Sequence, residues 1–267
     1  VEFKNRIEDI EHPIVREALR LMEIDFPIEV TTFADIPAGT GLGSSSSFAV
    51  GLMHALYALK GQYVTKYTLA ESAAQIEINI LKRTMGKQDH YAASYGNLNI
   101  FTFQPDESVV VEPVFYQMEV KNTLDDNLML FYTKLKRDAS EVLKTQNRAI
   151  SKKRKVLQKM RDLVHPLKDV LSGKNNVNVF GEILHKNWML KKSITDQVSS
   201  AKIDVYYDKA IAAGAIGGKL LGAGGGGFLL FYVEKKNQNS VREVLSELYE
   251  LKFELDTDGT RITYYDQ

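Results

Sequence analysis

The sequence predicts a mixed α+β protein with two domains, 1–124 and 125–267. Helix-like and strand-like segments follow one another without the strict β-α alternation of a doubly wound sheet. A chain of 267 residues is long enough for one large core or for two modest domains. The polar segment 121–127, which ends in two aspartates and an asparagine, has the composition of a boundary between them.

The elements of the first domain are predicted from apolar spacing and helix-start signals. In order, we expect a helix over 13–22, a strand over 28–33, a Gly/Ser loop, a helix over 48–59, a helix over 67–81 that starts after Thr65, a loop over 84–89, and strands over 97–103 and 109–119.

The second domain is expected to open with a strand over 128–132. One long helix or a pair then covers 139–171, interrupted at Pro166 because proline cannot continue a helix interior. A helix over 204–213 should end at Gly214, a residue suited to the C-terminal cap. The remaining expected elements are a helix over 179–193, strands over 219–221 and 228–233, a helix over 241–251 and a strand over 260–265.

Composition excludes several functional classes. Lys plus Arg and Asp plus Glu both number 34, so no net charge recruits nucleic acid or an anionic membrane. The basic run 152–155 is interpreted as a solvated helix face, since apolar residues recur around it at helical spacing. There is no cysteine, the five histidines lack zinc-ligand spacing, and no signal peptide or apolar run of about 20 residues is visible. We expect a soluble cytoplasmic protein, with the oligomeric state, a homodimer included, left open.

The segment 37–48 is the most informative part of the chain. Three glycines allow a tight turn with exposed amides, and the serines after them can cap a helix. Such a helix start is a site for phosphate. The simpler alternative is a turn followed by a helix cap. No lysine follows the glycines as in a P-loop, and the Gly-x-Gly-x-Gly spacing differs from the dinucleotide fingerprint.

A second glycine-rich run occupies 222–227, where five of six residues are glycine between two apolar strands. A plain hairpin turn is the alternative interpretation, but two or three residues would suffice for it. Five glycines are costly in chain entropy. Close backbone approach to a ligand or to the first loop would explain them.

Two acidic residues are candidates for chemistry. Asp89 lies in the predicted loop 84–89, and the apolar residues 91–93 indicate that this loop is constrained, so its carboxylate could accept a proton from a substrate hydroxyl. Glu77, twelve residues earlier on the predicted helix, could bind Mg2+ together with a serine hydroxyl of the first loop. A surface turn aspartate and a helix-surface glutamate are the alternatives.

Taken together, these segments resemble the GHMP kinase superfamily of galactokinase, homoserine kinase, mevalonate kinase and phosphomevalonate kinase. The motif Pro-x-x-x-Gly-Leu-Gly-Ser-Ser is matched by Pro37 and by Gly41 to Ser45, and the C-terminal glycine motif by Gly222 to Gly227. A closer likeness is to the sugar-kinase branch that includes D-glycero-D-manno-heptose 7-phosphate kinase. It rests on Gly86 to Asp89, Phe131 to Thr133 with Arg137, Trp188 with Leu190 and Lys191, and Ile262 to Asp266.

The resemblance implies a ribosomal-protein-S5-like N-terminal domain and a ferredoxin-like C-terminal domain. It implies that Gly41 to Ser46 wrap the ATP phosphates, that Ser45 and Glu77 bind Mg2+, and that Asp89 orients or deprotonates the acceptor hydroxyl. Lys87 and Arg137 are weaker candidates for substrate contacts, with exposed salt bridges as the alternative. The full set of residues expected to bind the nucleotide is Pro37, Gly39, Gly41, Leu42, Gly43, Ser44, Ser45, Ser46, Gly224, Gly225 and Gly226.

The activity implied is ATP- and Mg2+-dependent phosphorylation of a sugar or sugar-phosphate hydroxyl, foremost that of a heptose 7-phosphate. A hexose or a mevalonate-like alcohol is the alternative acceptor, and a non-catalytic nucleotide-binding regulator is the alternative class. The family's first motif, an N-terminal Pro-x-Arg-x-x stretch, has no counterpart in the sequence. We therefore expect the N-terminal domain of this sequence to lack its first strands, with the motif outside the sequence, truncated or truly absent as the open alternatives.

Overall fold

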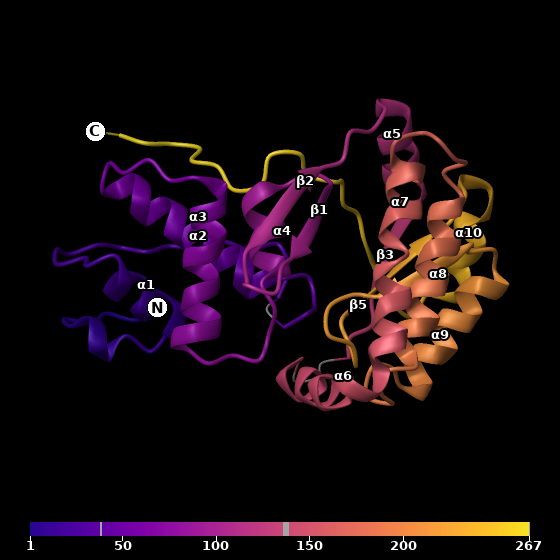
Figure 1. Cartoon of the computed structure of the whole chain (residues 1–267), viewed down its shortest axis with the longest axis horizontal. Coiled ribbons are helices and arrows are strands. Elements are labelled where there is room, and N and C mark those ends of the chain that lie inside the picture. Colours follow the sequence, from indigo (N-terminus) through magenta and orange to yellow (C-terminus); the bar gives the residue numbers. More distant parts are fainter. Residues whose placement is uncertain (38, 136–138, 267) are drawn as a thin grey trace. The chain divides into compact units, whose positions relative to one another are not determined.

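The computed structural model describes residues 1–37, 39–135 and 139–266, and it contains both helices and strands (Figure 1). The predicted α+β class is confirmed. The chain divides into two compact units: unit 1 comprises Val1–Ala38, Gly43–Val110 and Asp256–Gln267, and unit 2 comprises Gly39–Leu42 and Val111–Leu255. The predicted division at 124/125 stays a prediction. Within the described ranges, no helix is long and apolar enough to cross a membrane.

Unit 1 is built mainly from helices. Its elements are η1 (Ile7–Asp9), α1 (Pro13–Leu21), α2 (Ser44–Leu59), α3 (Lys66–Ala74), the π-helical η2 (Gln75–Ile80), α4 (Gln88–Tyr95) and β1 (Asn99–Phe103), which pairs with β2 (Val109–Pro113). Side chains cap two of the helices, since His12 accepts from the Val15 amide at α1 and Thr65 from the Thr68 amide at α3.

The core of unit 1 lies among the first three helices. Figure 1 shows α2 beside α3, and their apolar residues belong to one buried cluster. The cluster draws on Ile14, Ala18 and Leu19 of α1, Leu52, Met53 and Leu56 of α2, and Leu69 and Ala73 of α3. This spacing matches the predicted helices over 13–22 and 48–59, although α2 begins four residues earlier, at Ser44.

The helix predicted over 67–81 changes its type half-way. It is α-helical as far as Ala74 and π-helical over Gln75–Ile80. Single π turns inside helices are rare and occur frequently at functional sites. Beyond the π segment, Lys82 has a positive φ of 53°, so the chain turns back sharply at this point.

The last residues of the chain return to unit 1, shown in yellow in Figure 1. The amide of Asn97 donates to the carbonyl of Asp256, and the amide of Thr260 donates to that of Ala93. Two glycines permit this return, because a Cβ on Gly96 would stand 2.0 Å from the nitrogen of Gly259. The predicted strand over 260–265 is wrong, since Thr260 contacts α4 through one hydrogen bond and these described residues join no sheet.

Three predictions about unit 1 and the segment after it are wrong. The segment 28–33 is not a strand and is mostly exposed, because a strand needs a pairing partner and the described residues supply none. Asp89 lies in the first turn of α4, not in a loop. The strand predicted over 109–119 ends at Pro113, and the polar stretch 121–127 belongs to a helix, α5 (Met118–Asn127).

Unit 2 contains an antiparallel sheet with the strand order β4-β5-β3-β6 among its described residues. The strands are β3 (Leu128–Tyr132), β4 (Gly217–Leu220), β5 (Phe228–Tyr232) and β6 (Tyr249–Leu251). The helices, besides α5, are α6 (Ala139–Arg161), α7 (Val164–Leu171), α8 (Val179–Lys192), α9 (Ala201–Ala212) and α10 (Gln238–Val244), and η3 spans Lys235–Asn237.

The core of unit 2 lies on the sheet. Leu230 of β5 pairs with Leu130 of β3, and neighbouring side chains on the opposite face, such as Phe231, pack with Trp188 of α8 and Tyr207 of α9. The segment predicted as one helix over 241–251 is instead α10 followed by β6. Pro166 lies in the first turn of α7, where proline is tolerated, so the helix interruption falls just before it.

We predict that Gly217→Ala destabilises unit 2. A Cβ on Gly217 would stand 1.9 Å from the carbonyl oxygen of Gly181, at the contact of β4 with α8. Such overpacking costs about 1–3 kcal/mol. The matched control is Gly51→Ala on α2, where a Cβ meets nothing within 4 Å. Thermal denaturation followed by circular dichroism should show a lower melting temperature for Gly217→Ala alone, and equal melting temperatures would contradict the prediction.

Candidate functional site

The first glycine-rich segment leads directly into the first turn of α2. Gly43 is the N-cap with φ 69°, and it makes no side-chain cap hydrogen bond. The serines, predicted as caps, instead form the first turn of the helix. The amides of Ser44, Ser45 and Ser46 therefore have no partner within the helix, which makes this end suited to an anion. Ser46 is fully buried, and its hydroxyl has no partner among the described residues.

The two glycine-rich segments touch through their backbones within unit 2. A Cβ on Gly222 would stand 2.7 Å from Cα of Gly41, and a Cβ on Gly227 would stand 2.2 Å from the carbonyl oxygen of Thr40. Neither distance leaves room for a side chain. The expectation that the second run permits close approach to the first loop is thus confirmed.

The other glycines of the second run also lie against backbone. A Cβ on Gly224 would stand 2.8 Å from the Val198 carbonyl oxygen, and a Cβ on Gly226 would stand 2.3 Å from the Leu135 carbonyl oxygen. The amide of Gly225 donates to Val198 at 2.9 Å. These glycines are required by packing inside unit 2, whatever else they bind.

Glu77 of unit 1 has three hydrogen-bond donors around its carboxylate. It is fully buried in the π-helical segment. Arg83 Nη1 lies 2.5 Å from Oε1, His90 Nε2 lies 2.9 Å from Oε2, and the Ser45 hydroxyl donates as well. Burial opposes ionisation, but these hydrogen bonds outweigh it and lower the pKa of Glu77. Glu77 is therefore a carboxylate at neutral pH.

Asp89 lies beside the start of α2. A Cβ on Gly43 would stand 3.3 Å from Cγ of Asp89 and 3.4 Å from its Oδ2. His90, the next residue of α4, is the histidine that binds Glu77. Unit 1 thus brings together Ser45, Glu77 and Asp89, three residues that the sequence predicted for the site.

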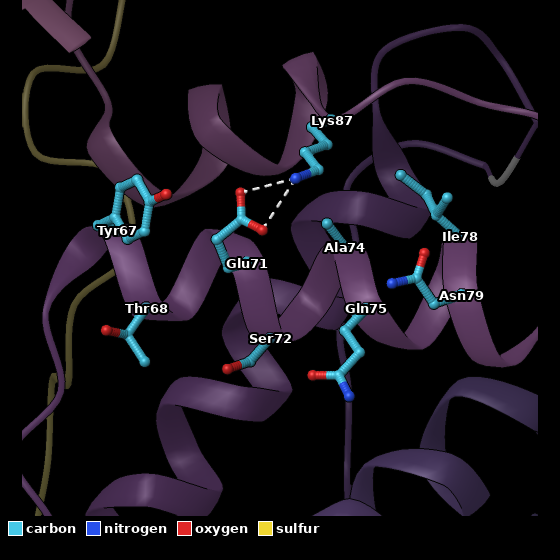
Figure 2. Close-up of a pocket in the computed structure, with 9 residues that line it drawn as sticks. All are labelled: Tyr67, Thr68, Glu71, Ser72, Ala74, Gln75, Ile78, Asn79 and Lys87. Atoms are coloured by element: carbon cyan, nitrogen blue, oxygen red, sulfur yellow. Dashed lines mark hydrogen bonds and ion pairs between the residues drawn. The ribbon is translucent and has the colours of Figure 1, made fainter. Parts of the chain in front are cut away.

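Lys87, the N-cap of α4, forms an ion pair and a hydrogen bond within unit 1. Its Nζ lies 3.0 Å from Glu71 Oε2 and 3.1 Å from the carbonyl oxygen of Glu107. Figure 2 shows this ion pair at the edge of a hollow over α3 and η2. Tyr91 also donates to Glu71, at 2.5 Å. The other weaker candidate, Arg137, lies outside the described residues.

The Ser45–Glu77 pair fits Mg2+. This cation takes oxygen ligands, and proteins usually supply one or two while phosphates and water supply the rest. A hydroxyl and an ionised carboxylate already in contact are such a donor set. Among the described residues, no group of three or more His, Cys, Asp or Glu side chains could hold a metal alone.

Sequence reasoning missed two residues of this cluster, His90 and Arg83. The histidines lack zinc-ligand spacing, so no pattern in the sequence selects His90, although it follows Asp89 directly. Its contact with Glu77 depends on how α4 packs against the preceding helix, which no spacing rule gives. Arg83 follows Glu77 by six residues and returns to it through the positive φ of Lys82.

Comparisons with known proteins agree with the two glycine-rich motifs. The GHMP kinases N terminal domain model matches residues 13–97, and the GHMP kinases C terminal model matches 167–251. D-glycero-alpha-D-manno-heptose 7-phosphate kinase of Campylobacter jejuni is 29% identical over 238 residues, which cover 86% of this chain and 69% of that protein. Galactokinase of Pyrococcus furiosus is 26% identical over 82% of this chain and 68% of its own length.

A solved structure gives the same result. A D-glycero-D-manno-heptose 1-phosphate kinase from Bacteroides thetaiotaomicron aligns with a TM-score of 0.74 and 26% identity, covering 95% of this chain and 74% of that one. The aligned part includes both units. The predicted two-domain fold is confirmed by this likeness together with the family matches.

We predict that Gly222→Ala separates the two glycine-rich segments. The new methyl group would overlap the backbone of Gly41, and the positive φ of 68° at this position adds strain. Hydrogen exchange should speed up at the amides of residues 225 and 227, which bond Val198 and Leu135. Gly86→Ala, where a Cβ meets nothing within 4 Å, is the control. Unchanged exchange in Gly222→Ala would contradict the prediction.

Proposed function

The chain belongs to the GHMP kinase family, whose sugar kinases are phosphotransferases acting on hydroxyl groups, and we propose that it transfers the terminal phosphoryl group of ATP to a hydroxyl of a heptose 7-phosphate. The names of two relatives support a heptose phosphate as the acceptor class. The family matches, 13–97 and 167–251, fall within the proposed domains 1–124 and 125–267.

The observation that carries the proposal is the cluster of Ser45, Glu77 and Asp89 at the start of α2. Phosphoryl transfer asks mainly for positioning and for neutralisation of phosphate charge. We propose that Ser45 and Glu77 hold Mg2+, which supplies that neutralisation when bound. Asp89 then orients the acceptor hydroxyl and accepts its proton as the new oxygen–phosphorus bond forms, while the bond from that phosphorus to the bridging oxygen breaks and ADP leaves.

The glycine-rich segments have a separate role in this proposal. The amides at the start of α2, over 41–46, donate to the ATP phosphates, since a helix start favours anions. Gly222 and Gly227 keep the second segment close to the first. Gly224 to Gly226 would steady the phosphate loop and the transferring phosphoryl group. Preorganised donors of this kind cost no rearrangement at the moment of reaction.

Asp89→Asn should lower turnover by about 100-fold or more, because an amide cannot accept the hydroxyl proton. The assay is ADP release with Mg-ATP across heptoses, hexoses and their phosphates. A sugar that supports wild-type turnover, and that the variant loses, identifies the acceptor. Equal turnover in the variant would remove Asp89 from the chemistry. Nucleotide binding without turnover on any sugar would favour the non-catalytic regulator.

Ser45→Ala and Glu77→Gln should raise the Mg2+ concentration needed for half-maximal turnover. Each removes one proposed oxygen ligand or its charge, while the ATP site keeps its amides. The measurement is a Mg2+ titration of ADP release at saturating ATP and sugar. Ser47→Ala, an exposed serine two residues further along α2, is the control. Normal Mg2+ titrations for both variants would contradict the metal assignment.

A further inference from the structure

Two donors to Glu77, Arg83 and His90, differ in how far their side chains are exposed to solvent. His90 is fully buried and binds Oε2, whereas the Arg83 side chain is 35% exposed and binds Oε1. A buried carboxylate needs compensation, because an isolated charge in the interior is strongly unfavourable. Arg83 supplies the formal positive charge that compensates Glu77 in this structure.

The backbone places Arg83 at this position. After the π-helical segment the chain reverses at Lys82, whose positive φ is unusual for a residue with a side chain. The amide of Arg83 then donates to the carbonyl of Glu77 at 2.9 Å. The reversal therefore ties Arg83 to Glu77 by backbone and by side chain, and the guanidinium contacts the carboxylate from the partly exposed side.

His90 has no comparable freedom. Its ring is enclosed, and Nδ1 has no hydrogen-bond partner among the described residues. The hydrogen bond that the described residues give this ring is the contact of Nε2 with Oε2 of Glu77, at 2.9 Å. This contact fixes the carboxylate and, through the adjacent residue of α4, the turn that carries Asp89.

We propose that Arg83 holds the place of the divalent cation at Glu77 and is displaced when the cation binds, whereas His90 stays bound and positions the carboxylate. The inference rests on the proposed function, since it takes Glu77 as a metal ligand. A guanidinium and a divalent cation compete for the same buried carboxylate, and they repel each other strongly at short range. Arg83 can be hydrated on leaving, because its side chain already reaches solvent.

The two neighbours of Glu77 should therefore have opposite effects on metal affinity. Mn2+ serves as the probe, titrated into the full chain at saturating ADP and followed by the enhancement of water proton relaxation. Arg83→Gln removes the competitor and should tighten Mn2+ binding about fivefold or more. Arg83→Lys keeps the charge and should stay near the wild type.

His90→Leu should weaken Mn2+ binding by about 10- to 100-fold, as is usual when the partner of a metal ligand is lost. His90→Gln should recover most of this loss, because its side-chain amide can donate to Glu77 as Nε2 does. A role of His90 in folding alone would show equal Mn2+ affinity for the two variants, and that result would overturn the positioning role. Melting temperatures confirm that each variant is folded.

The matched control is Arg20→Gln. Arg20 Nη1 lies 2.5 Å from Oε2 of the buried Glu17, the same distance as in the Arg83 pair, but on α1. Its loss should leave Mn2+ affinity unchanged.

Weaker or unchanged Mn2+ binding in Arg83→Gln would overturn the proposed exchange, in which the cation displaces Arg83 from Glu77. Glu77→Gln separates this failure from a failure of the proposed function. If Glu77→Gln lowers Mn2+ affinity while Arg83→Gln fails to raise it, the metal site stands and the exchange is wrong. If Glu77→Gln binds Mn2+ as the wild type does, the proposed metal site is wrong and the exchange falls with it.

Discussion

A buried negative charge organises unit 1. The carboxylate of Glu77 is cut off from water, so the fold must surround it with donors, and these come from different parts of the chain. Ser45 comes from the first turn of α2, Arg83 from the reversal after η2, and His90 from the first turn of α4. One carboxylate thereby sets the mutual positions of the helix start, the reversal and the turn that carries Asp89.

A constraint of space organises the corresponding part of unit 2. Gly41 and Gly222 lie so close that their backbones exclude any side chain, and Gly227 lies against Thr40 in the same way. Two chain segments about 180 residues apart thus form a joint made of main chain alone. Such a joint presents peptide groups to a ligand, and the backbone fixes the positions of these groups. Side-chain ligands would in addition have to be held in one rotamer.

The helices of the core were predictable because their buried face requires apolar residues at helical spacing, and this spacing is visible in the sequence. Ile14, Leu52 and Leu69 recur with their neighbours at helical spacing, and each lies in the core of unit 1. Segments without a packed face were predicted poorly. The alternation over 28–33 indicates a strand, but a strand forms with a partner, and α5 was overlooked because its buried residues are few among polar ones.

The residues of the candidate site likewise divide into those that the sequence indicates and those that it does not. The glycine-rich runs and the residues Ser45, Glu77 and Asp89 stand out by local composition or by resemblance, and the structure brings these three side chains together. Arg83 and His90 have no local signal. Their contacts depend on a π turn, a left-handed residue and the packing of α4, and each of these is decided by tertiary structure. Partners of a site residue are therefore harder to predict than the residue itself.

The return of the last residues to unit 1 has a consequence for the order of folding. Residues 111–255 form unit 2 between two parts of unit 1, and the hydrogen bond from Thr260 to Ala93 joins those parts. Domains generally fold as units while the chain is synthesised from its N-terminus. Unit 2 has all but the short piece 39–42 in one continuous stretch, whereas the contacts of Gly96 with Gly259 form only after residues 256–267 have been synthesised. Unit 1 therefore cannot complete its contacts until the chain beyond unit 2 has been made.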